Sequence, residues 1–166
     1  MSRKVALCGI YVALAFIFSY LESMLSFGIS VPGVKIGLAN IVVIVALYTS
    51  GKKDAVIVNL VRVVLAGFIF GSGMSILYSL SGAVTSLTVM LVMKKTDLFS
   101  IKGVSIAGGV VHNMAQILLA VCILETRGIM YYLPVLVIAG AISGIVVGVL
   151  GEIICNKIRK SIHLYE

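Results

Sequence analysis

The sequence is poor in charged residues and in the residues that mark disulfide frameworks. Only 11% of its 166 residues are charged, tryptophan is absent, and there are two prolines and three cysteines. A hydrophobic fraction of 61% and a mean hydropathy of +1.20 exclude a soluble domain of this length. The composition therefore predicts a membrane protein.

Several catalytic and ligand-binding motifs are also missing. Cys8, Cys122 and Cys155 form no C-x-x-C pair and have no histidine at metal-ligand spacing, so we expect them to serve packing. No G-x-x-x-x-G-K-[ST] loop is present, so any coupling to ATP has to come from another subunit. The aspartates Asp54 and Asp97 stand singly, without the paired cluster that holds Mg²⁺ and a diphosphate. We therefore expect no metal, no cofactor and no catalysis by this chain alone.

Long apolar runs dominate what is present. The uncharged runs 63–93 and 128–151 exceed the roughly 20 residues that a helix needs to cross a bilayer. The first run must turn midway, and Gly71-Ser72-Gly73 supplies the break. Open sheet edges do not occur in lipid and no barrel pattern is visible, so we predict a single all-α domain over residues 1–166. The six predicted transmembrane spans are Val5 to Leu25, Ile36 to Ser50, Ala55 to Gly71, Met74 to Met93, Ile101 to Leu124 and Tyr131 to Cys155.

The basic residues fix the predicted orientation of these spans. All thirteen except Lys35, Arg62 and Arg127 fall in clusters at alternate span ends. The clusters are Arg3 and Lys4; Lys52 and Lys53; Lys94, Lys95 and Lys102; and Lys157, Arg159 and Lys160. The positive-inside rule places them all, and both termini, in the cytoplasm. The net charge of +7 thus sets topology and meets anionic lipid, and it does not indicate nucleic-acid binding.

Polar residues at membrane depth are the candidates for function, because each is costly there without a partner or a task. They are Glu22, Lys35, Asn40, Arg62, His112 and Gln116. Arg62 lies about 12 Å past the cytoplasmic end at Asp54, and His112 is similarly central. Gln116 is one turn further outward on the face of His112.

This polar set begins at the midplane and extends outward, which suggests a cavity that opens to the outside. Its formal charge of about +1 would suit a neutral polar or anionic small molecule. The alternative is structural: Glu22 and Arg62 form a buried ion pair, and Asn59, Asn113 and Gln116 are interhelical hydrogen-bond glue. The sequence leaves both interpretations open.

Small residues four positions apart let helix backbones approach closely. Gly140, Gly144 and Gly148 form such a stripe on the last span, where internal packing explains it. Gly9 and Ala13 form a shorter one near the cytoplasmic end of the first span. This pair could pack internally or dock a partner helix.

Five sequence blocks resemble one family. They are Pro32-Gly33-Val34-Lys35-Ile36-Gly37-Leu38-Ala39-Asn40, Val61-Arg62-Val63-Val64-Leu65, Ser79-Leu80-Ser81-Gly82, Val111-His112-Asn113-Met114-Ala115-Gln116 and Tyr132-Leu133-Pro134-Val135-Leu136. The family is labelled heptaprenyl diphosphate synthase component I or Gx transporter, and it looks like a divergent branch of the substrate-binding S-components of energy-coupling factor (ECF) transporters.

The resemblance implies a six-helix S-component-like subunit of a bacterial plasma membrane, energised by a separate coupling subunit and ATPases. It implies a small vitamin-like or precursor molecule as substrate, with Glu22, Lys35, Asn40, Arg62, His112, Asn113 and Gln116 as the candidate binding residues. Small residues on the first helix dock the coupling subunit in S-components, which maps here onto Gly9 and Ala13. The enzyme-like label raises a competing hypothesis, a non-catalytic membrane subunit associated with polyprenyl diphosphate or quinone precursor synthesis. A polar cavity would favour uptake, an apolar groove open to lipid would favour prenyl handling, and a closed interior would leave only a scaffold.

Overall fold

The computed structural model describes residues 2–26 and 37–163 and folds them into six α-helices and one short 3₁₀ helix. The α-helices are α1 (Ser2–Ser26), α2 (Leu38–Thr49), α3 (Lys52–Phe70), α4 (Gly73–Thr96), α5 (Ile101–Leu124) and α6 (Leu133–His163). The 3₁₀ helix η1 (Arg127–Tyr132) joins α5 to α6. The predicted all-helical architecture with six helices is confirmed.

Four of the segments are long and apolar enough to cross a membrane: 4–24, 73–96, 101–124 and 127–161. The remaining helices, α2 and α3, fall outside this group for two different reasons. With 12 residues, α2 is only about 18 Å long, and α3 includes four charged side chains among its 19 residues. A protein with several membrane-spanning helices is therefore supported, and the crossing by α2 and α3 stays a prediction.

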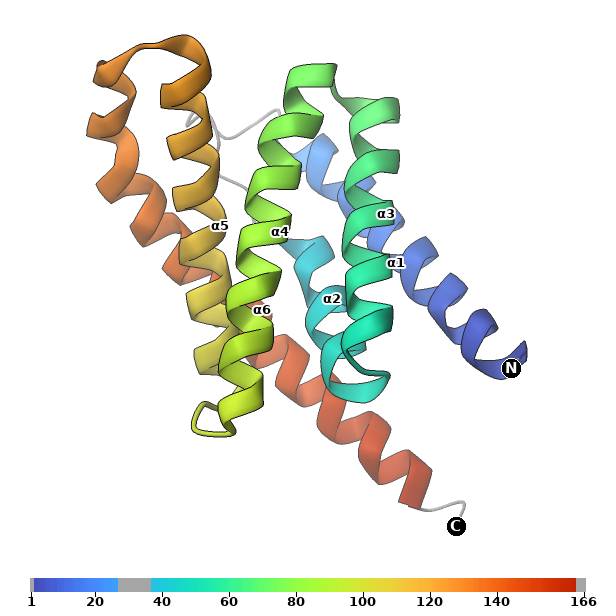
Figure 1. The fold of residues 1–166 in the computed structure, drawn as a ribbon. Helices are drawn as coiled ribbons and strands as arrows, with labels where there is room; N and C mark the ends of the chain where they lie inside the picture. The colour runs from blue at the N-terminus through green and yellow to red at the C-terminus, as the bar shows by residue number, and fades with distance from the viewer. Residues whose placement is uncertain (1, 27–36, 164–166) are drawn as a thin grey trace.

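The two ends of the bundle differ in charge. Figure 1 shows the start of α1, the end of α6 and the α2–α3 and α4–α5 turns toward one end of the bundle. The α3–α4 turn and the α5–η1–α6 connection lie toward the other. The four basic clusters belong to the first set of helix ends and turns, which we call the basic end. The alternation read from the sequence is thus reproduced in space, while the side of the membrane that each end faces stays a prediction.

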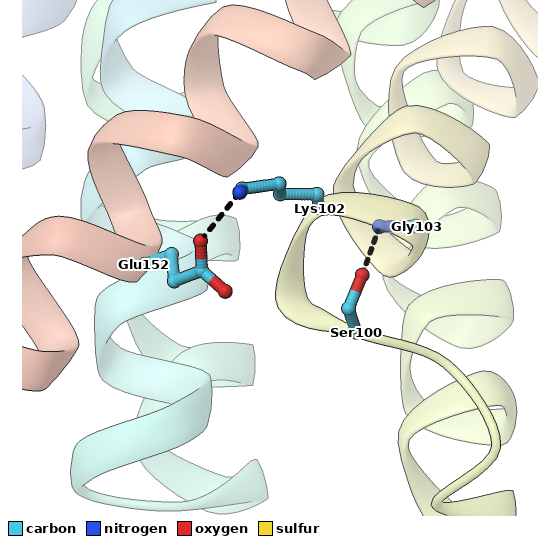
Figure 2. Close-up of polar contacts among 4 residues, drawn as sticks. All are labelled: Ser100, Lys102, Gly103 and Glu152. Carbon is cyan, nitrogen blue, oxygen red and sulfur yellow. Dashed lines mark hydrogen bonds and ion pairs between the residues drawn. The ribbon is translucent and has the colours of Figure 1, made fainter.

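Local sequence explains where the helices turn. Gly51 precedes α3 with φ +107°, a conformation that costs little without a Cβ. Ser72 and Ser100 cap the N-termini of α4 and α5 by accepting from the backbone N–H three residues on, at 3.2 Å in both cases. Figure 2 shows the second cap beside an ion pair of 2.9 Å between Lys102 and Glu152, which ties α5 to α6 at the basic end.

The core is centred on α2. Every side chain from Ile41 to Leu47 is buried, and α2 packs against α1, α3 and α6. Polar groups complete this packing at the basic end. Tyr11 and Thr49 are hydrogen-bonded at 2.9 Å, and Lys94 of α4 donates to the carbonyl of Leu47. A helix C-terminus presents carbonyls without intrahelical partners, so this lysine satisfies one of them and α2 is held from several sides.

The helices α5 and α6 touch through their backbones. A Cβ added to Gly144 would lie 2.6 Å from the Cα of Ile106, and one added to Gly148 would lie 2.8 Å from the Cα of Lys102. A Cβ on Gly140 would likewise meet the carbonyl oxygen of Gly109 at 2.6 Å. The predicted internal role of this glycine stripe is confirmed.

Large apolar side chains cover the outside of the bundle. Phe68 is 75% exposed and Tyr131 is 88% exposed, as expected where lipid is the solvent and aromatic residues mark its interface.

The cysteines differ from one another in their exposure. Cys155 is fully buried and packs in the core, whereas Cys122 is exposed, so packing inside the chain is the wrong role for it.

Candidate functional site

A cavity of about 260 Å³ lies between the helices, and all six α-helices contribute to its wall. Its deepest charged residue is Arg62, ten residues and about 15 Å along α3 from the basic end. From there the cavity extends to Gly71 and Ser75 at the α3–α4 turn and to Ser23 near the end of α1. It therefore occupies the middle and the half of the bundle opposite the basic end.

Arg62 is held in a fixed position by two asparagines. It is 8% exposed, and its Nη2 donates to Asn40 Oδ1 at 2.6 Å and to Asn59 Oδ1 at 3.0 Å. Its Nε also donates to Asn59 Oδ1 at 3.3 Å. These bonds occupy one side of the guanidinium group, and within the described residues Nη1 has no hydrogen-bond acceptor. The arginine thus keeps donors for a further group in the cavity whose wall it forms.

Glu22 has a different neighbour from the one considered in the sequence. Its carboxylate accepts a hydrogen bond from the backbone N–H of Gly37, immediately before α2. A negative charge is favourable there, because a helix N-terminus has unpaired N–H groups and a partial positive charge. In the described part of the chain the salt bridge is Lys102–Glu152, so the alternative in which Glu22 and Arg62 form a direct ion pair is wrong.

His112 fits the cavity wall because α4 has a glycine opposite it. A Cβ on Gly82 would lie 2.8 Å from the Cε1 atom of His112, so the imidazole rests directly on the α4 backbone. The Ser-Leu-Ser-Gly block read from the sequence thus ends on the residue that makes room for this ring.

Two asparagines join neighbouring helices. Asn59 Nδ2 donates to the carbonyl of Ala83 at 2.9 Å, and Asn113 Nδ2 donates to the carbonyl of Leu136 at 2.8 Å. Both side chains are buried, and each satisfies a backbone group of another helix. The interpretation as interhelical glue is confirmed for this pair. Asn113 also lines the cavity, so its two roles coexist.

The structure brings most of the predicted site residues together. Glu22, Asn40, Arg62, His112 and Asn113 line the cavity. Gln116 is half-buried but does not line it, and Lys35 lies outside the described residues. The lining charges of the described residues, one carboxylate and one guanidinium, balance, since the predicted excess of one positive charge came from Lys35. That these residues bind a solute stays a prediction.

Sequence reasoning missed a group of serines. The cavity is also lined by Ser19, Ser23, Ser75, Ser79 and Ser143. Their spacing carried a signal, because Ser19 and Ser23 flank Glu22 on one face of α1, and Ser75 and Ser79 are one turn apart on α4. Ser19 and Ser143 donate to backbone carbonyls of their own helices, at 2.9 and 3.1 Å. Their oxygens thereby offer lone pairs to the cavity.

The small-residue pair of α1 faces away from the bundle. Gly9 and Ala13 are both exposed, and a Cβ added to Gly9 would meet no atom within 4 Å. Packing within the described chain therefore does not explain this pair. A role in docking stays a prediction.

Comparison with known families adds one finding. A family model described as heptaprenyl diphosphate synthase component I matches residues 11–154, most of the chain. The chain belongs to this family. The family name and the apolar helical bundle together indicate a membrane subunit. No curated protein and no solved structure matches the chain, so the resemblance to ECF S-components stays a prediction.

Proposed function

We propose that this chain is a non-catalytic membrane subunit that binds a small polar or anionic solute in the cavity between its helices. The solute enters from the end opposite the basic clusters, which is the outside by the positive-inside rule. A separate ATPase module then reorients the subunit and the solute leaves inward. The observation that carries this proposal is Arg62, a buried arginine in the cavity wall that two asparagines hold through Nε and Nη2, so that among the described residues Nη1 is left for another acceptor.

The chemistry of the wall defines the class of solute. Arg62 offers charged donors for an anionic or carbonyl oxygen, and Asn40 and His112 add polar groups. The serines offer lone pairs for hydroxyl or amine donors of the same molecule. At about 260 Å³ the cavity is close to the lower limit of ligand pockets, which suits a small metabolite.

The family name favours a second candidate, a membrane subunit associated with polyprenyl diphosphate synthesis. The Arg62 guanidinium would suit a diphosphate, but a long isoprenoid chain needs an apolar groove. The wall of this cavity is mixed, because five serines, two asparagines and two charged side chains stand beside apolar residues such as Val63 and Phe70. The cavity therefore favours uptake of a polar solute. The family name would then reflect association with a pathway.

Docking to an energising partner is the remaining part of the proposal. Gly9 and Ala13 lie on the outer face of α1, where an approaching helix would meet no side chain at Gly9. Close backbone approach between helices in lipid depends on such small residues. We therefore assign this face to a helix of the coupling subunit.

Native mass spectrometry of the purified protein tests the proposal. We expect a bound small molecule that is lost from Arg62→Gln and kept in Gly9→Leu, because only the first residue lines the cavity. An isoprenoid adduct that survives Arg62→Gln would instead support the prenyl-associated candidate.

A further inference from the structure

A second, smaller hollow adjoins the cavity on the side of the basic end. Its volume is about 20 Å³, and it shares Asn40, Gly109 and Ser143 with the cavity. Ser86 and Ser105 extend it toward the basic ends of α4 and α5. One water needs at least about 10 to 15 Å³ of such volume, so the hollow accommodates a single water molecule.

Two of the serines offer lone pairs to this hollow. Ser86 is 5% exposed, and its hydroxyl donates to the carbonyl of Ala83 at 3.3 Å. Ser143 donates in the same way to the carbonyl of Gly140 at 3.1 Å. The single proton of each hydroxyl is engaged in this bond, so each oxygen can act only as an acceptor toward a molecule in the hollow.

The other two polar side chains offer donors. Ser105 is 3% exposed and lines the hollow, so its hydroxyl can donate there. Asn40 Oδ1 accepts from Arg62, so its Nδ2 amide is the group of this side chain that can donate into the hollow. Both groups line the hollow and can therefore donate to a molecule in it.

We propose that the hollow binds one ordered water, which ties Asn40 to Ser105 and thereby helps to hold Arg62 in place. The water accepts from Ser105 and from Asn40 Nδ2, and it donates to the oxygens of Ser86 and Ser143. Two donors and two acceptors match the four hydrogen bonds of water. A metal cation would fit poorly, because it would face the Asn40 amide hydrogens beside the Arg62 guanidinium.

Ser105 is then a positioning residue that acts through the water and Asn40. It does not line the large cavity, yet it orients the amide whose Oδ1 accepts from Arg62 Nη2 at 2.6 Å. Any effect on solute affinity rests on the proposed function, whereas the water itself does not.

Nuclear magnetic resonance of the labelled full-length protein tests the water directly. Dipolar cross-peaks should link water to the methyl groups of Val147, which lines the hollow. Ser105→Val should abolish them by filling the space, and it should shift the Nε–H resonance of Arg62. Ser105→Ala should shift that resonance less. The matched control is Ser81→Ala, which removes a hydroxyl that bonds to its own helix and lines neither space.

Two results would overturn the proposal. Absence of water cross-peaks to Val147 in the unaltered protein would show that the hollow is dry. Cross-peaks that vanish in Ser105→Val while the Arg62 resonance stays unmoved in both Ser105 variants would show a water with no positioning role. Neither result bears on solute binding, which mass spectrometry tests separately.

Discussion

Replacing Arg62 with methionine should lower the stability of the solute-free protein by losing its bonds to asparagine. Asn40 and Asn59 are the acceptors, and within the described residues no ion pair joins Arg62 to Glu22. The substitution therefore leaves two amide oxygens without their donor. It does not strand a buried carboxylate, because Glu22 still accepts from Gly37.

The expected size follows from two opposing terms. Hydrogen bonds to a charged group contribute about 1.5 to 3 kcal/mol each, so two lost acceptors cost about 3 to 6 kcal/mol. Removing a charge from the membrane interior returns about 2.5 to 3.5 kcal/mol. The two ranges together allow a net change between a gain of about 0.5 and a loss of about 3.5 kcal/mol, and their midpoints give a loss of about 1.5 kcal/mol. That central value corresponds to a fall in Tm of roughly 3 to 6 °C for a chain of this length.

Double-mutant cycles separate the two possible partners of Arg62. Unfolding free energies would be measured for Arg62→Met, Asn59→Leu, Glu22→Gln and the two double variants. We expect a coupling energy of about 1.5 to 3 kcal/mol between Arg62 and Asn59, which share hydrogen bonds, and a smaller one between Arg62 and Glu22, which interact only through space. Glu22→Gln is a suitable partner variant because its amide oxygen can still accept from Gly37. A larger coupling to Glu22 than to Asn59 would refute this reasoning.

Three further predictions concern the surfaces and the packing. An impermeant thiol reagent should label a cysteine placed near Ser72 and not one near Lys95, and labelling near Lys95 from outside would contradict the orientation. Gly9→Leu should abolish co-purification with a coupling subunit at unchanged Tm, whereas a lower Tm would indicate internal packing. Gly144→Ala should destabilise the protein by about 1 to 3 kcal/mol in thermal unfolding, because its Cβ would lie 2.6 Å from the α5 backbone. Gly73→Ala, with no atom within 4 Å, should change Tm little, and equal effects would contradict the backbone contact.

Hydropathy and charge were sufficient to predict the helices, because lipid imposes helical structure on apolar runs of this length. The α5 bounds agree with the predicted span, and the break at Gly71-Ser72-Gly73 is where α3 ends and α4 begins. The role of α2 was less predictable in this way. It ends at Thr49, close to the predicted end at Ser50, while the predicted start at Ile36 lies outside the described residues. Its apolar residues are buried against other helices, so they reflect burial in protein.

The candidate site was partly predictable, because ionisable and amide groups are rare at membrane depth. Arg62, Asn40 and His112 were found on this basis. The hydrogen bond between Glu22 and Gly37 was not, since its donor is a backbone N–H that no side-chain pattern reports. The serines were not predicted for a related reason. A serine whose hydroxyl bonds to its own helix is common in membrane spans. Ser19 and Ser143 differ from such serines only in their position beside the cavity, which the sequence does not report.

A high-resolution experimental structure of the protein, purified from its native membrane without added ligand, tests the central claim most directly. The account predicts difference density for a small molecule in the cavity that all six α-helices line. An oxygen atom of this molecule should lie within hydrogen-bond distance of Arg62 Nη1. Density for an isoprenoid chain in an apolar groove, together with an Arg62 guanidinium that faces only Glu22, would contradict it.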